Sequence, residues 1–394
     1  MDFGVSSGDT TVRLISTQLQ ALLLLVGTIV GAGMFGIPFV FSRAGFLVGA
    51  AELVILAGVM CMIHAAYAEV VLRTPELHRL PGYVSYYLGR KVGWLARTSY
   101  IFGLSGTLLA YVVLGGIFLG GILGRFFPAL PAFAGPAAFY LFGIAVIARS
   151  IRFESLVNAV LTAGLVAAVA AFSFRILPDL SLTDLLGVPG SLGLWRWAVP
   201  YGVIIFSLAG AAVIPDVRRV LTARNLRHFG RVALWGTLIP AGLYILFAAA
   251  VVGVTGEATT PDAVSGLAGR LGSGAVLAGN IIGFLAAITS FITLGLVFEG
   301  MLITDFGFRP HAAWAATAAI PAALYALGFQ NFITVIGIVG ALAVGIDGIL
   351  VLVVYRRSRG SGIRPPEFRI TIPAWLFWAA IVLLALGAMQ VMFR

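Results

Sequence analysis

The chain has 394 residues, of which 60% are hydrophobic and 10% charged, and its mean hydropathy is +1.06. Soluble domains carry about 25% charged residues, so this composition excludes a water-soluble protein and predicts one embedded in a bilayer. The net charge of +10 does not call for a nucleic-acid partner, because basic loops beside membrane helices face anionic lipid headgroups.

Charge-free windows of roughly 20 residues predict membrane-spanning helices. In chain order they cover 14–42, 98–124, 126–148, 155–174, 197–215, 232–256, 271–298 and 370–393. A further helix after Gly45 would tolerate Glu52, and the long window 310–346 divides at 328–331 into two helices. The windows are continuous rather than alternating, which indicates helices and not barrel strands. We therefore expect an all-α membrane protein with eleven transmembrane helices.

Basic residues predict the orientation of these helices. With a cytoplasmic N-terminus, most Lys and Arg fall in cytoplasmic loops; those outside them are Arg43, Arg125, Arg175, Arg196, Arg270 and Arg394. We expect a multi-pass protein of the inner (plasma) membrane with an extracytoplasmic C-terminus. The apolar stretch near the N-terminus is too long for a signal peptide and is interpreted as the first helix.

Two motifs recur at nearly the same spacing. Segment 33–40 (GMFGIPFV) is matched by 210–217 (GAAVIPDV), and 81–90 is matched by 261–270 through Pro-x-x-Val-Ser-x-x-x-Gly-Arg. The predicted fourth and fifth helices, shifted by the same amount, fall on the ninth and tenth. We therefore predict two five-helix units, and because five is odd, the second enters the membrane inverted, as in many secondary transporters.

The predicted organisation follows from this repeat. It comprises a cytoplasmic N-terminus (1–13), a first repeat (14–176), an extracytoplasmic loop (177–196), a second, inverted repeat (197–355), a basic cytoplasmic loop (356–370) and an eleventh helix (371–394).

Both repeats begin with an interrupted helix. The first predicted helix contains Gly27, Gly31, Gly33 and Gly36 ahead of Pro38, and 207–215 has the same pattern in the sixth. Glycine and proline lower the cost of leaving helical geometry, and freed backbone groups persist at membrane depth only where they line a cavity or bind something. Paired breaks at equivalent positions predict a central binding site.

The expected site suits a zwitterion. N–H groups at the start of the second half-helix favour a carboxylate, and the free carbonyls favour an ammonium or a small cation. Tyr111 could bond the carboxylate or be an ordinary packed aromatic. The candidate substrate-binding residues are Gly31, Ala32, Gly33, Met34, Tyr111, Phe206, Ser207, Ala209 and Gly210.

The segments 27–38 (GTIVGAGMFGIP) and 41–46 (FSRAGF) resemble the first helix of the hydroxy/aromatic amino acid permeases. The likeness extends through 80–83 (LPGY), 87–89 (YLG) and 213–215 (VIP). These permeases and the related amino acid/auxin permeases belong to the amino acid–polyamine–organocation superfamily. The resemblance implies the leucine-transporter fold, a 5+5 inverted repeat, here with an eleventh helix.

The resemblance also implies ion-binding and gating residues. In this fold, helix-one carbonyls and a helix-eight segment Ala-x-x-Thr-Ser bind sodium; the matching residues are Gly27, Val30, Ala286, Thr289 and Ser290. Proton-coupled relatives can place a Lys from helix five in that space, and 155–174 contains none, which favours sodium. Arg13 and Asp305 match the positions of an inner-gate ion pair.

Asp347 is an ionisable residue deep in the tenth predicted helix. Such residues are costly in a membrane and suggest function, so Asp347 could carry a coupling proton or pair with another helix. His64 and Glu52 could join a relay, but we interpret them as packing or interfacial residues.

We therefore expect a symporter of neutral amino acids that works by alternating access and is coupled to a cation, with sodium favoured. Family likeness favours aromatic or other hydrophobic substrates. Proton-coupled symport or exchange on the same scaffold remains an alternative. A membrane enzyme is disfavoured because the chain lacks the His-Glu-x-x-His and phosphate-binding Gly-x-x-x-x-Gly-Lys motifs. Cys61 is the only cysteine. Beyond the coupling ion, Na+ or H+, we expect no cofactor, and beyond the substrate and the bilayer no obligate partner.

Overall fold

Helices account for nearly all of the regular structure. In the computed structural model, which describes residues 16–149, 155–187, 198–361 and 363–392, no strand occurs among the described residues. In chain order the α-helices are α1 Thr17–Ile29, α2 Gly33–Ala44, α3 Phe46–Arg73, α4 Leu80–Leu88, α5 Arg90–Phe126, α6 Ala134–Ala148, α7 Ser155–Ile176, α8 Leu182–Leu186, α9 Tyr201–Ser207, α10 Ile214–Val220, α11 Phe229–Thr255, α12 Ala268–Phe306, α13 Pro310–Ala326, α14 Phe332–Val339, α15 Gly345–Ser361 and α16 Ala374–Met392.

Several of these helices are long and apolar enough to cross a bilayer. Within the described ranges there are seven such spans, and eight if the bent pair α1 and α2 counts as one. The chain is therefore a multi-pass membrane protein. The helices α6 and α13, with 15 and 17 residues, and the pair α9 and α10 fall below this length, so the number eleven and the orientation of the termini stay predictions.

Helix boundaries differ from the hydropathy windows where local chemistry intervenes. Helix α5 begins at Arg90, ahead of the window at 98, because a helix can continue past the apolar layer into charged residues. Helix α6 begins only at Ala134, because Pro128 and Pro131 lack the N–H that a helix interior needs. The predicted division at 328–331 is present: Asn331 caps α14 by accepting a hydrogen bond from the Thr334 N–H at 3.0 Å.

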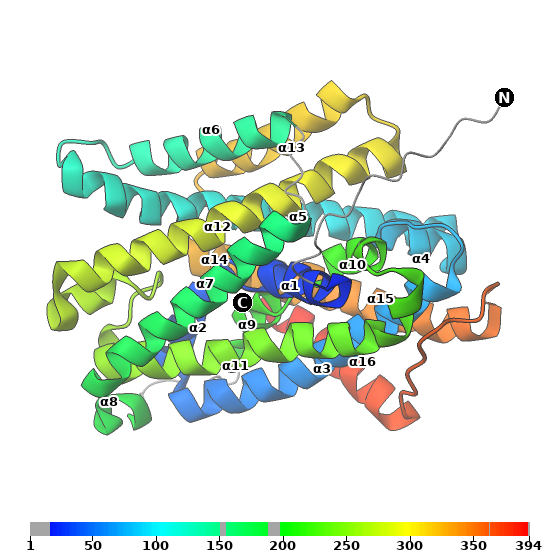
Figure 1. The fold of residues 1–394 in the computed structure, drawn as a ribbon, viewed down its shortest axis with the longest axis horizontal. Coiled ribbons are helices and arrows are strands. Elements are labelled where there is room, and N and C mark those ends of the chain that lie inside the picture. The colour runs from blue at the N-terminus through cyan, green and yellow to red at the C-terminus, as the bar shows by residue number, and fades with distance from the viewer. Residues whose placement is uncertain (1–15, 150–154, 188–197, 362, 393–394) are drawn as a thin grey trace.

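The helices form two groups around the interrupted segments (Figure 1). One group contains the two longest helices, α5 and α12, which pack against each other and against α6 and α13. In the other, α11 packs against α3. The segments α1–α2 and α9–α10 lie between these groups, and most residues of α2 and all of α9 are buried.

Helix α16 lies at the periphery. It packs against α15 and exposes large apolar side chains, including Trp375, Trp378 and Leu386. Such a surface is compatible with contact with lipid.

Candidate functional site

The first interrupted helix breaks between Ile29 and Gly33. The axes of α1 and α2 differ by 51°, and Val30 has a ψ of 73°, far from helical. The Gly31 N–H donates to the Ile29 carbonyl at 2.8 Å instead of to the carbonyl one turn earlier. The break expected from the glycine pattern is therefore present.

The second interruption separates α9 from α10. Helix α9 ends at Ser207, a short 3-10 turn covers Ala211–Val213, and α10 begins at Ile214 with Pro215 in its first turn. Proline is tolerated there because the first N–H groups of a helix have no intrahelical partner. This break matches the prediction for 207–215.

The two breaks pack directly on each other. A Cβ on Gly33 would lie 2.9 Å from the Ser207 Cα, and one on Gly210 would lie 2.8 Å from the Ile29 side chain. Helix α1 lies beside α10 and α2 beside α9, so the two segments run in opposite directions. Glycine permits this close approach because any side chain would collide.

Tyr244 on α11 ties the two breaks together. Its hydroxyl lies 2.6 Å from the Ile29 carbonyl oxygen and 3.0 Å from that of Ser207, and these residues end α1 and α9. The side chain is fully buried. Because it has one proton, the hydroxyl can donate fully to only one carbonyl at a time. Nothing in the sequence around Tyr244 indicated this role, because its partners are far away along the chain.

His64 on α3 also binds the second break. The Gly210 N–H donates to His64 Nε2 at 3.2 Å, and Nδ1 lies 2.8 Å from Thr237 Oγ1, which itself donates to the Ala233 carbonyl at 2.9 Å. These roles assign a neutral imidazole with its proton on Nδ1. His64 was expected to be a packing or interfacial residue, and it also binds the interrupted backbone.

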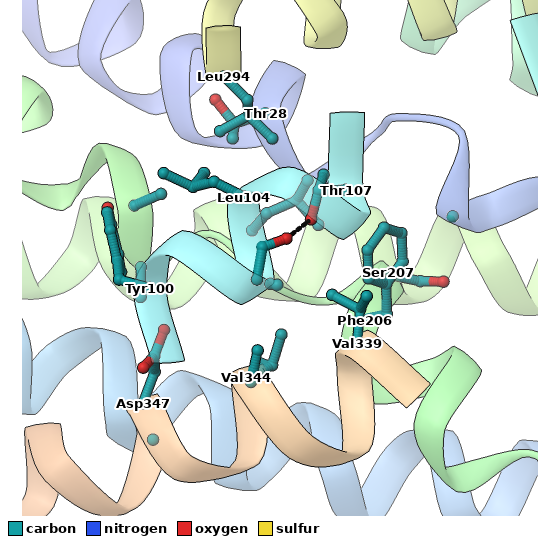
Figure 2. Close-up of a pocket in the computed structure, with 18 of the residues that line it drawn as sticks. Thr28, Tyr100, Leu104, Thr107, Phe206, Ser207, Leu294, Val339, Val344 and Asp347 are labelled. Carbon is teal, nitrogen blue, oxygen red and sulfur yellow. Dashed lines mark hydrogen bonds between the residues drawn. The ribbon is translucent and has the colours of Figure 1, made fainter. Parts of the chain in front are cut away.

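A cavity lies beside the breaks (Figure 2). It contains about 790 Å³ of atom-free space, including space open to solvent. Its walls are largely apolar, with polar groups contributed by hydroxyls and one carboxylate. The lining residues are Thr28, Ile29, Gly33, Met60, Ile63, Tyr100, Gly103, Leu104, Thr107, Tyr111, Phe206, Ser207, Ala209, Ala211, Ala212, Leu294, Val339, Ala343, Val344, Asp347 and Gly348. A largely apolar cavity with a few polar groups is typical of small-molecule sites.

The predicted substrate residues fall into two sets. Those that line the cavity are Gly33, Tyr111, Phe206, Ser207 and Ala209. The others, Gly31, Ala32, Met34 and Gly210, are buried in the breaks without lining it. A Cβ on Gly31 would lie 2.8 Å from the Tyr111 hydroxyl, so Tyr111 does reach the first break.

The predicted sodium ligands lie around the first break. Ser290 Oγ lies 3.5 Å from the Gly27 carbonyl oxygen, and Thr289 Oγ1 lies 3.3 Å from that of Ala286. Val30, the remaining candidate, is buried at the break itself. Neutral oxygens at such spacings fit a hard monovalent cation better than a transition metal.

Helix α7 faces this cluster with a hydroxyl. Thr162 packs directly against Gly27, and both line a second, largely apolar pocket with Thr289 and Thr293. The part of the chain that the structure describes holds no cluster of three His, Cys, Asp or Glu suited to a metal ion.

The two predicted gate residues are not brought together by a described contact. Arg13 lies outside the described residues. Asp305 is near the end of α12, and its Oδ2 has no hydrogen-bond partner among the residues described. The Arg13–Asp305 pair therefore stays a prediction.

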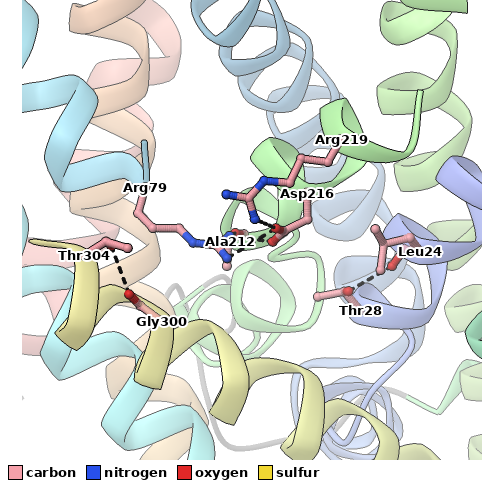
Figure 3. Close-up of polar contacts among 8 residues, drawn as sticks. All are labelled: Leu24, Thr28, Arg79, Ala212, Asp216, Arg219, Gly300 and Thr304. Atoms are coloured by element: carbon pink, nitrogen blue, oxygen red, sulfur yellow. Dashed lines mark hydrogen bonds and ion pairs between the residues drawn. The ribbon is translucent and has the colours of Figure 1, made fainter. Parts of the chain in front are cut away.

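A different ion pair borders the cavity (Figure 3). Arg79, just before α4, contacts Asp216 on α10 at 2.5 Å and also donates to the carbonyl of Ala212, a cavity residue, at 3.1 Å. Arg219 contacts the same carboxylate at 2.9 Å. Burial by itself lowers the pKa of Arg79, but Asp216, with smaller contributions from Tyr100 and Tyr67, offsets burial, so the pKa of Arg79 is raised. The one feature of the sequence that could have indicated this ion pair was Asp216 itself, because the first repeat has Phe39 at the equivalent position.

Comparison with known proteins gives consistent results. The family model for tryptophan/tyrosine permeases matches residues 15–392. The protein named tyrosine-specific transport system 2 from Haemophilus influenzae is 26% identical over 349 residues, which cover 81% of this chain and 82% of that protein. Both matches are to transport proteins, so the chain is a transporter and not an enzyme. It belongs to the tryptophan/tyrosine permease family.

Proposed function

We propose that this chain is a secondary transporter that carries tyrosine, tryptophan or both through the cavity beside the two breaks, by alternating access and coupled to a cation. The observation that carries the proposal is the direct contact between two interrupted, oppositely directed helices at the edge of a largely apolar cavity. Such a site offers backbone groups to a zwitterion and apolar walls to a ring.

The substrate carboxylate would bind at the start of α2. The Met34 and Phe35 N–H groups donate to the Gly31 and Ala32 carbonyls, so the Gly33 N–H and the positive end of the helix dipole would attract the carboxylate. Gly33, the first residue of α2, lines the cavity. The Tyr111 hydroxyl, which reaches the first break, is a further donor for the carboxylate.

The substrate ammonium would bind at the carbonyl end of α9. The Ile29 carbonyl already accepts from the Gly31 N–H and contacts the Tyr244 hydroxyl, so both of its lone pairs are used. The Ser207 carbonyl contacts Tyr244 and has a second lone pair, and Ser207 lines the cavity. The ammonium would therefore share the Ser207 carbonyl with Tyr244.

Sodium is the coupling ion that the residues favour. The oxygens of Gly27, Ala286, Thr289 and Ser290 are grouped beside the first break. Thr162 on α7 faces Gly27 with a neutral hydroxyl, where a basic side chain would repel a cation. An ion bound there would favour the break geometry that the substrate also needs, which is the basis of coupling.

The inverted five-helix repeat is part of the proposal, and the helix boundaries support it. Shifted by 180 residues, α5 would cover 270–306, and α12 is Ala268–Phe306. The opposite directions of the two interrupted segments are those an inverted repeat requires. Near the start of each of these long helices one glycine has a positive φ: Gly89 at 87° and Gly272 at 76°. The sequence motif pairs Gly89 with Gly269, so the glycine with the matching backbone conformation lies three residues after the one that the motif pairs.

Uptake by the purified chain in proteoliposomes tests the proposal. Labelled tyrosine, tryptophan and leucine would each be offered with an inward sodium gradient, with a proton gradient, and with neither. We expect concentrative uptake of an aromatic amino acid with the sodium gradient and little uptake of leucine. Failure of every aromatic amino acid to enter under any gradient would contradict the proposed function.

Proton coupling is the second candidate, and one observation favours it. Asp347 lines the cavity, and His64 binds the second break, so two protonatable groups lie at the site. Concentrative uptake driven by a proton gradient in sodium-free buffer would support this candidate over the first.

A further inference from the structure

Asp347 is the only acidic residue among the described residues that line the cavity. The wall around it is otherwise apolar or hydroxylated, and a carboxylate in such a wall is costly unless something bonds to it. We therefore expect a ligand in this cavity to place a hydrogen-bond donor near the Asp347 carboxylate.

We propose that the Asp347 carboxylate accepts a hydrogen bond from the polar atom on the substrate's ring and so selects tyrosine and tryptophan over phenylalanine. This inference rests on the proposed function, because it assumes that an aromatic amino acid occupies the cavity. The phenol O–H of tyrosine and the indole N–H of tryptophan are both donors on an otherwise apolar ring system, and phenylalanine has neither.

The carboxylate is held for this role by one neighbour. Ser99 on α5 donates to Asp347 Oδ1 at 2.8 Å, and Ser99 itself is buried. Among the hydrogen bonds of the described residues, none involves Asp347 Oδ2. One oxygen is thus fixed and the other is free to accept.

The rest of the helix presents Asp347 to the cavity. The π-helical turn Gly340–Val344 precedes α15, and such turns are frequent at functional sites because they redirect side chains. Val339, Ala343, Val344 and Asp347 all line the cavity from this stretch. Three apolar side chains thus lead along one wall to a single acceptor.

Asp347 lies away from the breaks. In Figure 2, Asp347 and Tyr100 lie at one side of the drawn cavity, and Phe206 and Ser207 lie at the other. A substrate whose amino and carboxylate groups bind at the breaks would direct its ring away from them, toward Asp347.

Three hydroxyls of the wall are weaker hydrogen-bond acceptors than the Asp347 carboxylate. Thr28, Thr107 and Ser207 each donate to a backbone carbonyl one turn earlier, at 2.9, 2.7 and 2.7 Å. Their oxygens are neutral acceptors, whereas hydrogen bonds to an ionised carboxylate are roughly twice as strong. A site that expects a hydrogen bond also rejects an analogue that cannot form one, because its polar group is then buried unpaired.

The test compares the ratio of tyrosine to phenylalanine transport, measured as kcat/KM in proteoliposomes, across matched variants. We expect the wild-type ratio to be at least tenfold and Asp347→Ala to lower it at least tenfold, mainly by admitting phenylalanine. Asp347→Asn keeps an acceptor oxygen without the charge and should give a ratio between those of the wild type and Asp347→Ala. The control Asp262→Ala removes a carboxylate that also bonds a serine, Ser265, but in a loop outside the cavity, and should leave the ratio unchanged.

Two results would overturn the inference while the proposed function stands: an unchanged ratio in Asp347→Ala, or the same ratio in the Ala and Asn variants. If Asp347→Ala transports nothing, the shift in melting temperature of the purified variant on adding each amino acid replaces uptake. Equal stabilisation of Asp347→Ala by tyrosine and phenylalanine would then support the inference. A preference of this variant for tyrosine as large as that of the wild type would overturn it. If the wild-type chain carries no aromatic amino acid, the proposed function fails instead.

Discussion

The interrupted segments α1–α2 and α9–α10 contrast with the long helices α5 and α12. Helix α5 has 37 residues, and α12 has 39 with a kink near its start at Gly272; both bond most of their backbone groups internally. The interrupted segments expose backbone groups, and distant side chains such as Tyr244 and His64 bind them. Recognition is therefore expected where the backbone is unpaired, and the long helices provide the rigid wall beside it.

The largest effect is expected from separating the two breaks. Gly33→Ala should reduce transport at least tenfold, because the new Cβ would lie 2.9 Å from the Ser207 Cα, and backbone cannot yield as a flexible side chain would. Gly58→Ala in α3 is the control, since a Cβ there meets nothing within 4 Å. Uptake kinetics at equal protein content measure both. Normal transport by Gly33→Ala would mean that the close contact of the breaks is dispensable.

The next effect concerns the hydroxyl that joins the breaks. Tyr244→Phe leaves the Ser207 carbonyl without its donor and removes one of the two donors near the Ile29 carbonyl. An unpaired buried carbonyl costs about 1–3 kcal/mol, and we expect a clear fall in kcat. Tyr140→Phe removes a comparable bond, to the Ala318 carbonyl at 2.9 Å, between continuous helices and should have little effect. Similar losses of kcat in Tyr244→Phe and Tyr140→Phe would show that hydrogen bonds at the breaks matter no more than those between other helices.

The proposed sodium site belongs to both regions, because its ligands come from the first break and from the long helix α12. Ser290→Ala removes the α12 hydroxyl nearest the Gly27 carbonyl, and we expect the sodium concentration for half-maximal uptake to rise several-fold. Thr304→Val, further along α12, removes a hydroxyl that donates to the Gly300 carbonyl at 2.9 Å outside this pocket and serves as the control. Unchanged sodium dependence in Ser290→Ala would argue against a sodium site here.

The smallest effect is expected at the ion pair beside the cavity. Arg79→Gln should slow uptake modestly, because Arg79 bonds both Asp216 and the Ala212 carbonyl. Arg219→Gln should do less, because the Arg219 side chain is 53% exposed and exposed pairs contribute about 0–1 kcal/mol. Uptake by Arg79→Gln, Asp216→Asn and the double variant forms a cycle; additive losses would show that the pair does not act as a unit.

The seven or eight long apolar spans of the described residues and the two breaks were predictable from the sequence, whereas the full number of eleven stays a prediction. A window of apolar residues is a local property, and so is a glycine-rich segment followed by proline, so both can be read without knowing the fold. The resemblance to aromatic amino acid permeases was likewise carried by local motifs, and the family match confirms it. The predicted superfamily, coupling ion and orientation of the termini depend on more than these local patterns and stay predictions.

Only the tertiary structure decided which side chains bind the backbone groups freed at the two breaks. Tyr244 lies 215 residues from Ile29, His64 lies 146 from Gly210, and Asp347 lies 248 from Ser99. A single sequence carries no sign of such pairings, because a tyrosine or histidine in an apolar helix looks the same whether it packs or binds. Helix formation is dictated by near neighbours along the chain, whereas the chemistry of the cavity depends on which distant helices the fold brings together.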